Sequence, residues 1–205
     1  MYVPEAFALR EPRALHDFVQ RHAFALLVTA REGAFEATHL PLWLERERGP
    51  LGTLFGHVAR ANPHWRSFDG RARALAVFSG PHAYVSPRWY GKPGVPTWNY
   101  VAVHAEGVPR LVNDPDAVRS LLVRLTEAHD GPGSHAALPE DLVARLSKGI
   151  VAFELPIERW VGKRKLSQNK SAADRAGVVA GLRASGEPDA VALAELVQAA
   201  GVDEP

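Results

Sequence analysis

Residues 84 to 100 read YVSPRWYGKPGVPTWNY, two segments dense in Trp and Tyr on either side of a Gly/Pro loop at 91–96. Each Trp or Tyr ring offers a flat apolar face with one polar tip. Ser86, Thr97 and Asn99 place short hydrogen-bonding groups between the rings. The composition favours either a hairpin with aromatic cross-strand pairs or a surface that binds a flat heteroaromatic ligand with a polar edge.

Short apolar segments separated by turn residues surround this stretch. Strands are expected at 24–30, 35–45, 51–58, 74–79, 82–90, 97–112 and 149–155. Pro41 implies an edge or a bulge in the second of them. Strands this close together, joined by turns, predict a mainly β fold built on a small antiparallel barrel.

Helical patterns lie around these strands. Helices are expected at 12–22, from Asp114-Pro115 onward, at 139–147, at 171–185 and at 188–200. We therefore predict one domain over residues 1–205 with peripheral helices, two of which form a C-terminal element at about 171–201.

The composition excludes several classes of protein. Hydrophobic residues make up 46% and charged residues 23%, as in ordinary globular proteins. With no Cys, disulfides and zinc–thiolate sites are impossible. A net charge of +1 gives no global basic field for nucleic acid, and no apolar run approaches the length of a membrane span. We expect a cytoplasmic protein that does not contact the membrane.

The segment GHVARANPHW, residues 56–65, follows an expected strand. Asn62 and Pro63 are typical of a helix start, which exposes unpaired backbone N–H groups. Arg60, just upstream, can bind a phosphate group through its guanidinium. The segment predicts either an anion site or a capped surface helix with an exposed Arg.

The histidines and serines do not form a recognisable catalytic or metal motif. His57 and His64 lack the spacing of a metal site, and His39, His82 and His104 are interpreted as strand histidines. No Ser lies in a Gly-x-Ser-x-Gly turn, and neither phosphate-binding glycine motif is present. Hydrolysis, a Rossmann domain and nucleoside triphosphate binding are therefore disfavoured, and no metal is expected.

Residues 159–170 read RWVGKRKLSQNK, with five basic residues in twelve positions. One interpretation is a basic flap that closes over an anionic ligand, with Gln168 and Asn169 at its polar edge. A solvated basic turn before a helix capped by Ser171, or a small nucleic-acid patch, explains the run equally simply.

Four blocks together resemble one family. They are MYVPEAF, GHVARANPHW, the pair FSGPHAYVSPRWY and VPTWNYVAVHAEG, and KLSQNKSAADR. In order and spacing they resemble the PaiB-type family of FMN-binding split-barrel proteins, known as negative transcriptional regulators and part of the pyridoxamine-phosphate-oxidase-like superfamily.

The resemblance implies a six-stranded antiparallel split β-barrel that forms a homodimer with FMN between the protomers. By analogy, Arg60 and Asn62 would hold the phosphate, and the strand 37–40, with Thr38 and His39, would border the flavin ring. The remaining cofactor-binding candidates are His57, Trp98, Asn99, Trp160, Lys165, Gln168 and Asn169, the last three as a lid. No catalytic residue is assigned.

The resemblance implies a flavin-dependent redox or flavin-sensing role linked to negative transcriptional regulation, and it leaves open whether the protein is an FMN-dependent oxidoreductase. The Leu166–Asn169 block replaces an Arg-rich motif of the oxidases, which disfavours pyridoxamine-phosphate oxidation. Two alternatives remain: a transcriptional repressor with a non-catalytic barrel, and a haem-binding barrel with His57 or His64 as axial ligand. Direct DNA binding has little support because the helix expected at 188–200 is acidic and apolar.

Overall fold

The computed structural model describes residues 1–31, 33–134 and 139–200. The chain groups into two compact units. One unit, here called the large unit, holds residues 12–78 and 104–160; the small unit holds residues 1–11, 79–103 and 161 onward.

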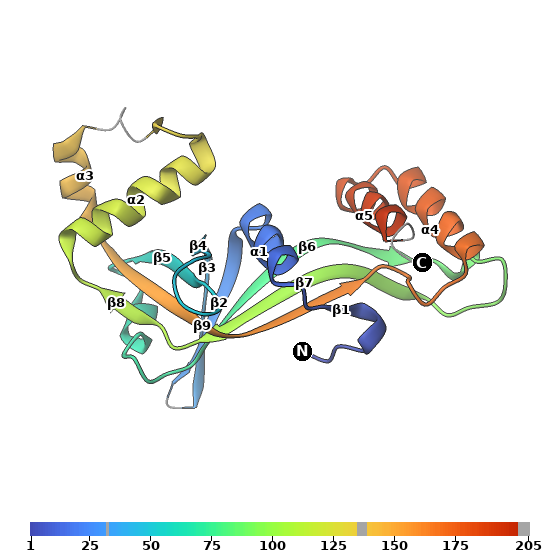
Figure 1. Ribbon diagram of the computed structural model, residues 1–205, viewed down its shortest axis with the longest axis horizontal. Coiled ribbons are helices and arrows are strands. Elements are labelled where there is room, and N and C mark those ends of the chain that lie inside the picture. The colour runs from blue at the N-terminus through green and yellow to red at the C-terminus, as the bar shows by residue number, and fades with distance from the viewer. Residues whose placement is uncertain (32, 135–138, 201–205) are drawn as a thin grey trace. The chain divides into compact units, whose positions relative to one another are not determined.

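The described residues form nine strands, five α-helices and three short 3₁₀ helices. In chain order they are η1 (Glu5–Phe7), β1 (Ala8–Leu9), α1 (Pro12–Arg21), β2 (Phe24–Arg31), β3 (Ala34–Pro41), β4 (Trp43–Glu45), β5 (Thr53–Ala59), η2 (Pro63–Ser67), β6 (Ala74–Val85), η3 (Pro87–Trp89), β7 (Thr97–Gly107), β8 (Arg110–Val112), α2 (Pro115–Asp130), α3 (Glu140–Ser147), β9 (Ile150–Lys165), α4 (Ala172–Ala184) and α5 (Pro188–Ala199) (Figure 1).

The strands form one sheet in the order β3-β2-β6-β7-β9-β5-β4, and β1 and β8 also pair with β9. β2 is antiparallel to both β3 and β6, and β9 is antiparallel to β5. The expected count of six barrel strands is wrong for the described residues, which form an open, mainly antiparallel sheet of nine strands. The chain nevertheless has the predicted class, mainly β with peripheral helices.

Two strands are longer than the sequence predicts. The strands expected at 74–79 and 82–90 are one strand, β6, which continues through Gly80 and Pro81. Pro81 lies four residues beyond Val77, the last residue of β6 with an assigned partner in β2, so its missing N–H removes no bond of that ladder.

The second is β9, which continues ten residues past the expected end at Leu155 and takes in most of the predicted basic flap. Lys163 is buried there, and its ammonium donates to the carbonyl of Tyr2 at 3.1 Å and lies 5.1 Å from the ring centre of Tyr100. A strand can carry this charge because a carbonyl and aromatic faces replace the lost water.

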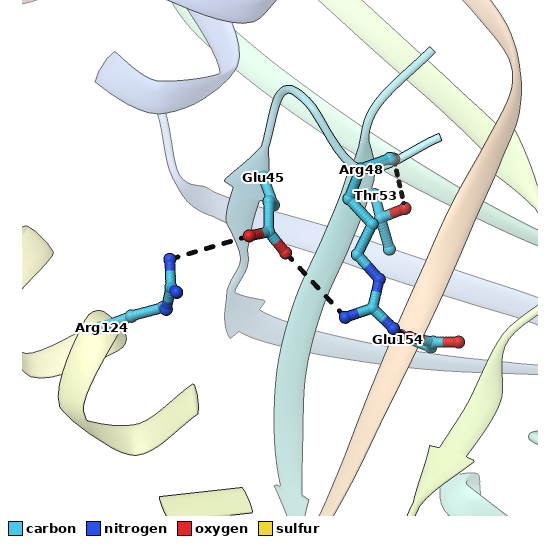
Figure 2. A network of polar contacts seen from close by, with 5 residues as sticks. All are labelled: Glu45, Arg48, Thr53, Arg124 and Glu154. Carbon is cyan, nitrogen blue, oxygen red and sulfur yellow. Dashed lines mark hydrogen bonds and ion pairs between the residues drawn. The ribbon is translucent and has the colours of Figure 1, made fainter. Parts of the chain in front are cut away.

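In the large unit, α2 packs on the β5–β9 ladder through Leu121 and Leu125, which contact Phe55 and Ala152. Beside this cluster, a polar network joins β4, β5, β9 and α2 (Figure 2). Glu45 lies 3.7 Å from Arg124 and 4.0 Å from Arg48, whose guanidinium donates to Glu154 at 2.6 Å. Carboxylates and guanidiniums alternate along the network, so no charge of one sign accumulates where α2 meets the sheet.

In the small unit, α4 and α5 pack together, and α4 lies against η3. Ser171 caps α4 by accepting from the N–H of Asp174 at 3.1 Å, as predicted. Two glycines allow close contact: a Cβ at Gly177 would lie 2.1 Å from the carbonyl oxygen of Trp89, and one at Gly181 would lie 2.2 Å from its indole ring. The Asp174 carboxylate also accepts from the N–H of Gly91 at 2.8 Å. Trp89 of η3 therefore packs directly against the backbone of α4.

Candidate functional site

A buried hydrogen-bond network joins β2, β3 and η2 in the large unit. The ring nitrogens of His64 lie 2.9 Å from Oγ1 of Thr29 and 2.8 Å from Oγ1 of Thr38. Asn62 donates to Thr38 at 3.1 Å and accepts from the N–H of His64 at 3.0 Å. Because each member holds another, the network fixes η2 against β2 and β3.

The network favours neutral His64. The ring is 2% exposed, and burial lowers its pKa, while the nearby Glu36 carboxylate acts in the opposite direction. Glu36 itself accepts a hydrogen bond from the Ser67 hydroxyl at 2.8 Å. With both ring nitrogens already hydrogen-bonded, His64 is not available as a haem ligand without breaking the network.

The expected helix start at Asn62-Pro63 is only the five-residue 3₁₀ helix η2. Asn62 caps it as predicted, but both ends of its amide are used within the protein. So short a helix has almost no dipole, so the prediction that its N-terminus forms an anion site is not supported.

Arg60 is exposed, and its guanidinium donates to two backbone carbonyls, those of Lys148 and Ile150, at 2.9 Å each. These bonds use Nε and Nη2 and tie the residue after β5 to the start of β9. They hold the guanidinium in place at the surface. Arg60 is therefore both a structural residue and a fixed positive charge two residues from Asn62.

Thr38 and His39 lie on β3, which is at one end of the strand order. Thr38 points inward into the network, whereas His39 is exposed, 6.1 Å from the ring centre of Phe24. An end strand presents a row of backbone N–H and C=O groups that no neighbouring strand uses. Such a row can bind the polar edge of a flat ligand.

His57 lies away from this network. It is opposite Ala152 in the β5–β9 ladder and on the same face of β5 as Phe55, which packs under α2. Its Nδ1 is buried and has no hydrogen-bond partner among the described residues, and burial lowers its pKa. The structure therefore does not bring His57 together with Thr38.

Trp160, the remaining candidate in the large unit, is half-buried on β9. Its Nε1 donates to the carbonyl of Leu51 at 2.9 Å, and its ring centre lies 5.7 Å from that of His16. The indole holds the loop before β5 and the helix α1. These contacts give it a structural role in the large unit.

In the small unit, the neighbours Trp98 and Asn99 point to opposite faces of β7. Trp98 is 54% exposed and packs edge-on against Tyr84, with ring centres 6.2 Å apart. Asn99 is 1% exposed and donates to the Ser167 hydroxyl at 2.8 Å, while its Oδ1 is buried without a partner among the described residues. Strand alternation prevents the two from lining one surface of the same protomer.

The residues predicted to form a lid lie in a loop that is held by hydrogen bonds within the small unit. Lys165 donates to the Thr97 hydroxyl, and its pKa is lowered by burial and by the charges of Lys163 and Lys170. Gln168 folds back on its own turn, donating to the carbonyl of Arg164 at 2.6 Å and accepting from the N–H of Leu166 at 2.7 Å.

Two further residues of this loop show its character. Asn169 is exposed, and Ser167 adopts the left-handed conformation with φ 63°, which is strained for a residue with a Cβ. The segment is thus tied to the small unit and is not a free basic flap.

Sequence reasoning missed an apolar outer face on β3, β2 and β6 in the large unit. The ladders place His39, Leu26 and Val77 in one row and Ala37, Val28 and Leu75 in the next. The two Leu and two Val side chains are half-buried, Ala37 is exposed, and Phe35 is 80% exposed at one end of this face. The run FALLVTA was the available signal, since a strand that is apolar on both faces is typically covered on both.

Comparisons with known proteins agree on one family. The model of a family described as "Putative FMN-binding domain" matches residues 1–159. The chain is 36% identical to the Protease synthase and sporulation protein PAI 2 of Bacillus subtilis, over 97% of each chain.

Among solved structures, the flavocytochrome Anf3 of Azotobacter vinelandii is similar with a TM-score of 0.67 at 13% identity, covering 85% of this chain and 78% of that one. The FAD and heme binding protein of Mycobacterium smegmatis is similar with a TM-score of 0.61 at 20% identity, over 86% and 80%. At these identities the likeness concerns the fold alone.

Proposed function

The chain belongs to the FMN-binding, PaiB-type family whose model spans residues 1–159, and from this premise we propose a homodimeric flavoprotein with a flavin-dependent redox or flavin-sensing role. FMN is its cofactor. The placement of FMN rests on one observation, that β3 is the end strand of the sheet and lies close to Arg60. Thr38 of β3 accepts a hydrogen bond from Asn62 at 3.1 Å, and Asn62 is two residues from Arg60, whose charge is held in place.

The donor set of this region fits FMN. The free edge of β3 alternates N–H donors and C=O acceptors, which match the mixed polar edge of an isoalloxazine. Arg60 would bind the phosphate through Nη1, because Nε and Nη2 are already engaged. When bound, FMN supplies hydride and single-electron transfer, and the residues of the chain orient it and exclude water.

The roles of the other candidates follow from their positions. Trp98 would offer an exposed ring face for stacking, supplied by the partner protomer. Asn99, Lys165 and Gln168 would act indirectly, by shaping the loop at Ser167. His57 and Trp160 are not used in this proposal because their contacts are internal to the large unit.

The first test separates binding of the phosphate from folding. We expect Arg60→Ala to weaken FMN binding by about 2 kcal/mol, since one charge-assisted contact is lost, while riboflavin, which has no phosphate, keeps its affinity. Quenching of flavin fluorescence measures both. Equal losses for FMN and riboflavin would show that Arg60 acts only by holding the carbonyls of Lys148 and Ile150.

The apolar outer face of β3, β2 and β6 supports the homodimer. Its aliphatic rows continue to the exposed Phe35, and a self-complementary apolar sheet face is typical of a two-fold interface. We expect Val28→Glu to convert a dimer into a monomer, because a carboxylate would be buried in the interface without a partner.

Size-exclusion chromatography with light scattering measures the change. The control, Ala128→Glu, adds the same charge at an exposed position of α2 and should leave the dimer intact. A monomeric wild-type protein, or a Val28→Glu variant that remains dimeric, would contradict the assignment of this face.

Any regulatory role is proposed to be indirect, through flavin state, and located in the cytoplasm. Of the basic run at 163–170, Lys163 is buried and Arg164, Lys165 and Lys170 are half-buried, so it offers no exposed stripe to a phosphate backbone.

The haem alternative is not preferred, because His64 is fully hydrogen-bonded. No described helix is both long and apolar enough to cross a membrane.

A further inference from the structure

The large unit has a further feature beside α2 and α3, the two helices that follow β8 in the chain. A cavity of about 630 Å³ opens there between both helices, β8, the start of β9 and the residues after β5. This volume is within the range of sites for small organic ligands. Of the residues that line it, the proposed FMN site uses only Arg60.

More than half of the residues that line the cavity are apolar. Leu111 and Val112 come from β8, Val118 from α2, Val143 from α3 and Ile150 from β9. Over these aliphatic side chains a flavin ring would lose hydrogen bonds to water without replacing them. A hydrocarbon body loses nothing in this environment and gains burial.

The cavity lining also carries an excess of positive charge. Arg60, Arg119 and Lys148 contribute three cations from three separate segments, against the single carboxylate of Asp116. Because the free Nη1 of Arg60 is assigned to the FMN phosphate, Lys148 is the cation proposed to pair with a second ligand. The ammonium of Lys148 is exposed, and no ion pair is assigned to it within the described ranges.

We propose that this cavity binds a small amphipathic organic anion, a monocarboxylate with an aliphatic body, as a second ligand beside FMN. The carboxylate would lie against Lys148, and the body would lie on Leu111, Val118 and Val143. An uncharged molecule with the same hydrocarbon body would contact the aliphatic residues but would form no ion pair with Lys148.

The test is calorimetric titration of the FMN-loaded protein with octanoate and, in parallel, with 1-octanol. We expect octanoate to bind, octanol to bind at least about tenfold more weakly, and Lys148→Gln to weaken octanoate by about tenfold, as for loss of one charge-assisted contact. Arg145→Gln removes a neighbouring exposed cation of α3 that does not line the cavity, and it should change nothing.

Filling the cavity provides the second arm. Val118→Trp should abolish octanoate binding, and Ala144→Trp, at an exposed lining position, should do the same if Val118→Trp does not fold. Absence of octanoate binding to the wild-type protein, equal binding of octanol, or an unaltered affinity in both filled variants would overturn the proposal.

A flavin titration separates this proposal from the proposed function. FMN and octanoate should bind the wild-type protein together, and Val118→Trp or Ala144→Trp should keep FMN affinity. If FMN displaces octanoate, the cavity is the flavin site and the second ligand is excluded. If the protein binds octanoate but no flavin, the proposed function fails while this one stands.

Discussion

Replacing Gly177 by Ala is expected to destabilise the protein by about 2–3 kcal/mol, the usual cost of forcing extra atoms into a packed contact. The new Cβ would lie 2.1 Å from the carbonyl oxygen of Trp89, a backbone atom that cannot rotate away. The helix α4 would have to move from η3, weakening the Asp174 contact with Gly91. Urea unfolding measures the loss.

Whether Gly177→Ala raises or lowers the free energy of unfolding shows whether the contact with Trp89 exists. Gly within a helix is less favourable than Ala by about 1 kcal/mol, so the same substitution on a helix with free space should stabilise the protein. A stabilised Gly177→Ala variant would show that α4 does not rest on Trp89. Ala176→Gly, at an exposed position in the interior of α4, measures the helix-propensity difference without the contact to Trp89 and should cost about 1 kcal/mol.

Replacing His64 by Leu is the second large effect, with an expected loss of about 3 kcal/mol in the free energy of unfolding. Leu has a similar volume but leaves the buried hydroxyl of Thr29 without its partner and removes one of two partners from Thr38. Because this network fixes β3, FMN affinity should fall as well. Denaturant unfolding and flavin titration measure the two losses.

The matched control adds Thr29→Val to His64→Leu. A buried hydroxyl left unpaired carries most of the cost, so removing it should recover part of the lost stability. If the two losses simply add, the hydrogen bond between Thr29 and His64 does not contribute. Thr29→Val alone should destabilise, since it leaves one ring nitrogen of His64 unpaired.

His64→Leu should also change how the free energy of unfolding depends on pH. The pKa of His64 is lowered in the folded protein by burial, so the unfolded chain binds the proton more readily. Stability from this group is therefore present above about pH 6.5, the ordinary histidine value, and is lost as pH falls below it. His64→Leu should flatten this part of the stability curve, whereas His39→Gln, at an exposed ring, is the matched control.

Elements with local signals were predicted well from the sequence. Pro12 and the apolar spacing of Leu15, Phe18 and Val19 define α1, and Asp114 and Ser171 cap α2 and α4 through their own side chains. In each case the information lies within one turn of the chain.

The errors arose where distant residues decide the conformation. The charged run at 163–165 lies on a strand because Tyr2 and Tyr100, far along the chain, cover Lys163. Local composition cannot show this. The break expected at Gly80-Pro81 failed for a related reason, since only the position of β2 shows that the proline removes no bond of the β2–β6 ladder.

The sequence analysis grouped some of the residues that the structure joins. Thr38 and Asn62 are 24 residues apart, and the structure joins them by a hydrogen bond. His64, which contacts both, was considered only as a haem ligand after its spacing disfavoured a metal site. Trp98 and Asn99 were grouped because they are adjacent, where the alternation of a strand already separates them. The roles of these residues toward FMN stay predictions until the titrations are done.

Neither compact unit is a continuous piece of chain: β6, β7 and β9 each begin in one and end in the other. The family match at residues 1–159 stops inside β9, which runs to Lys165. Cutting the gene at that border would sever a strand in mid-course. Shuffling experiments that exchange segments between relatives should therefore place their crossovers in the loops at 46–50 or 185–187, never at the homology limit.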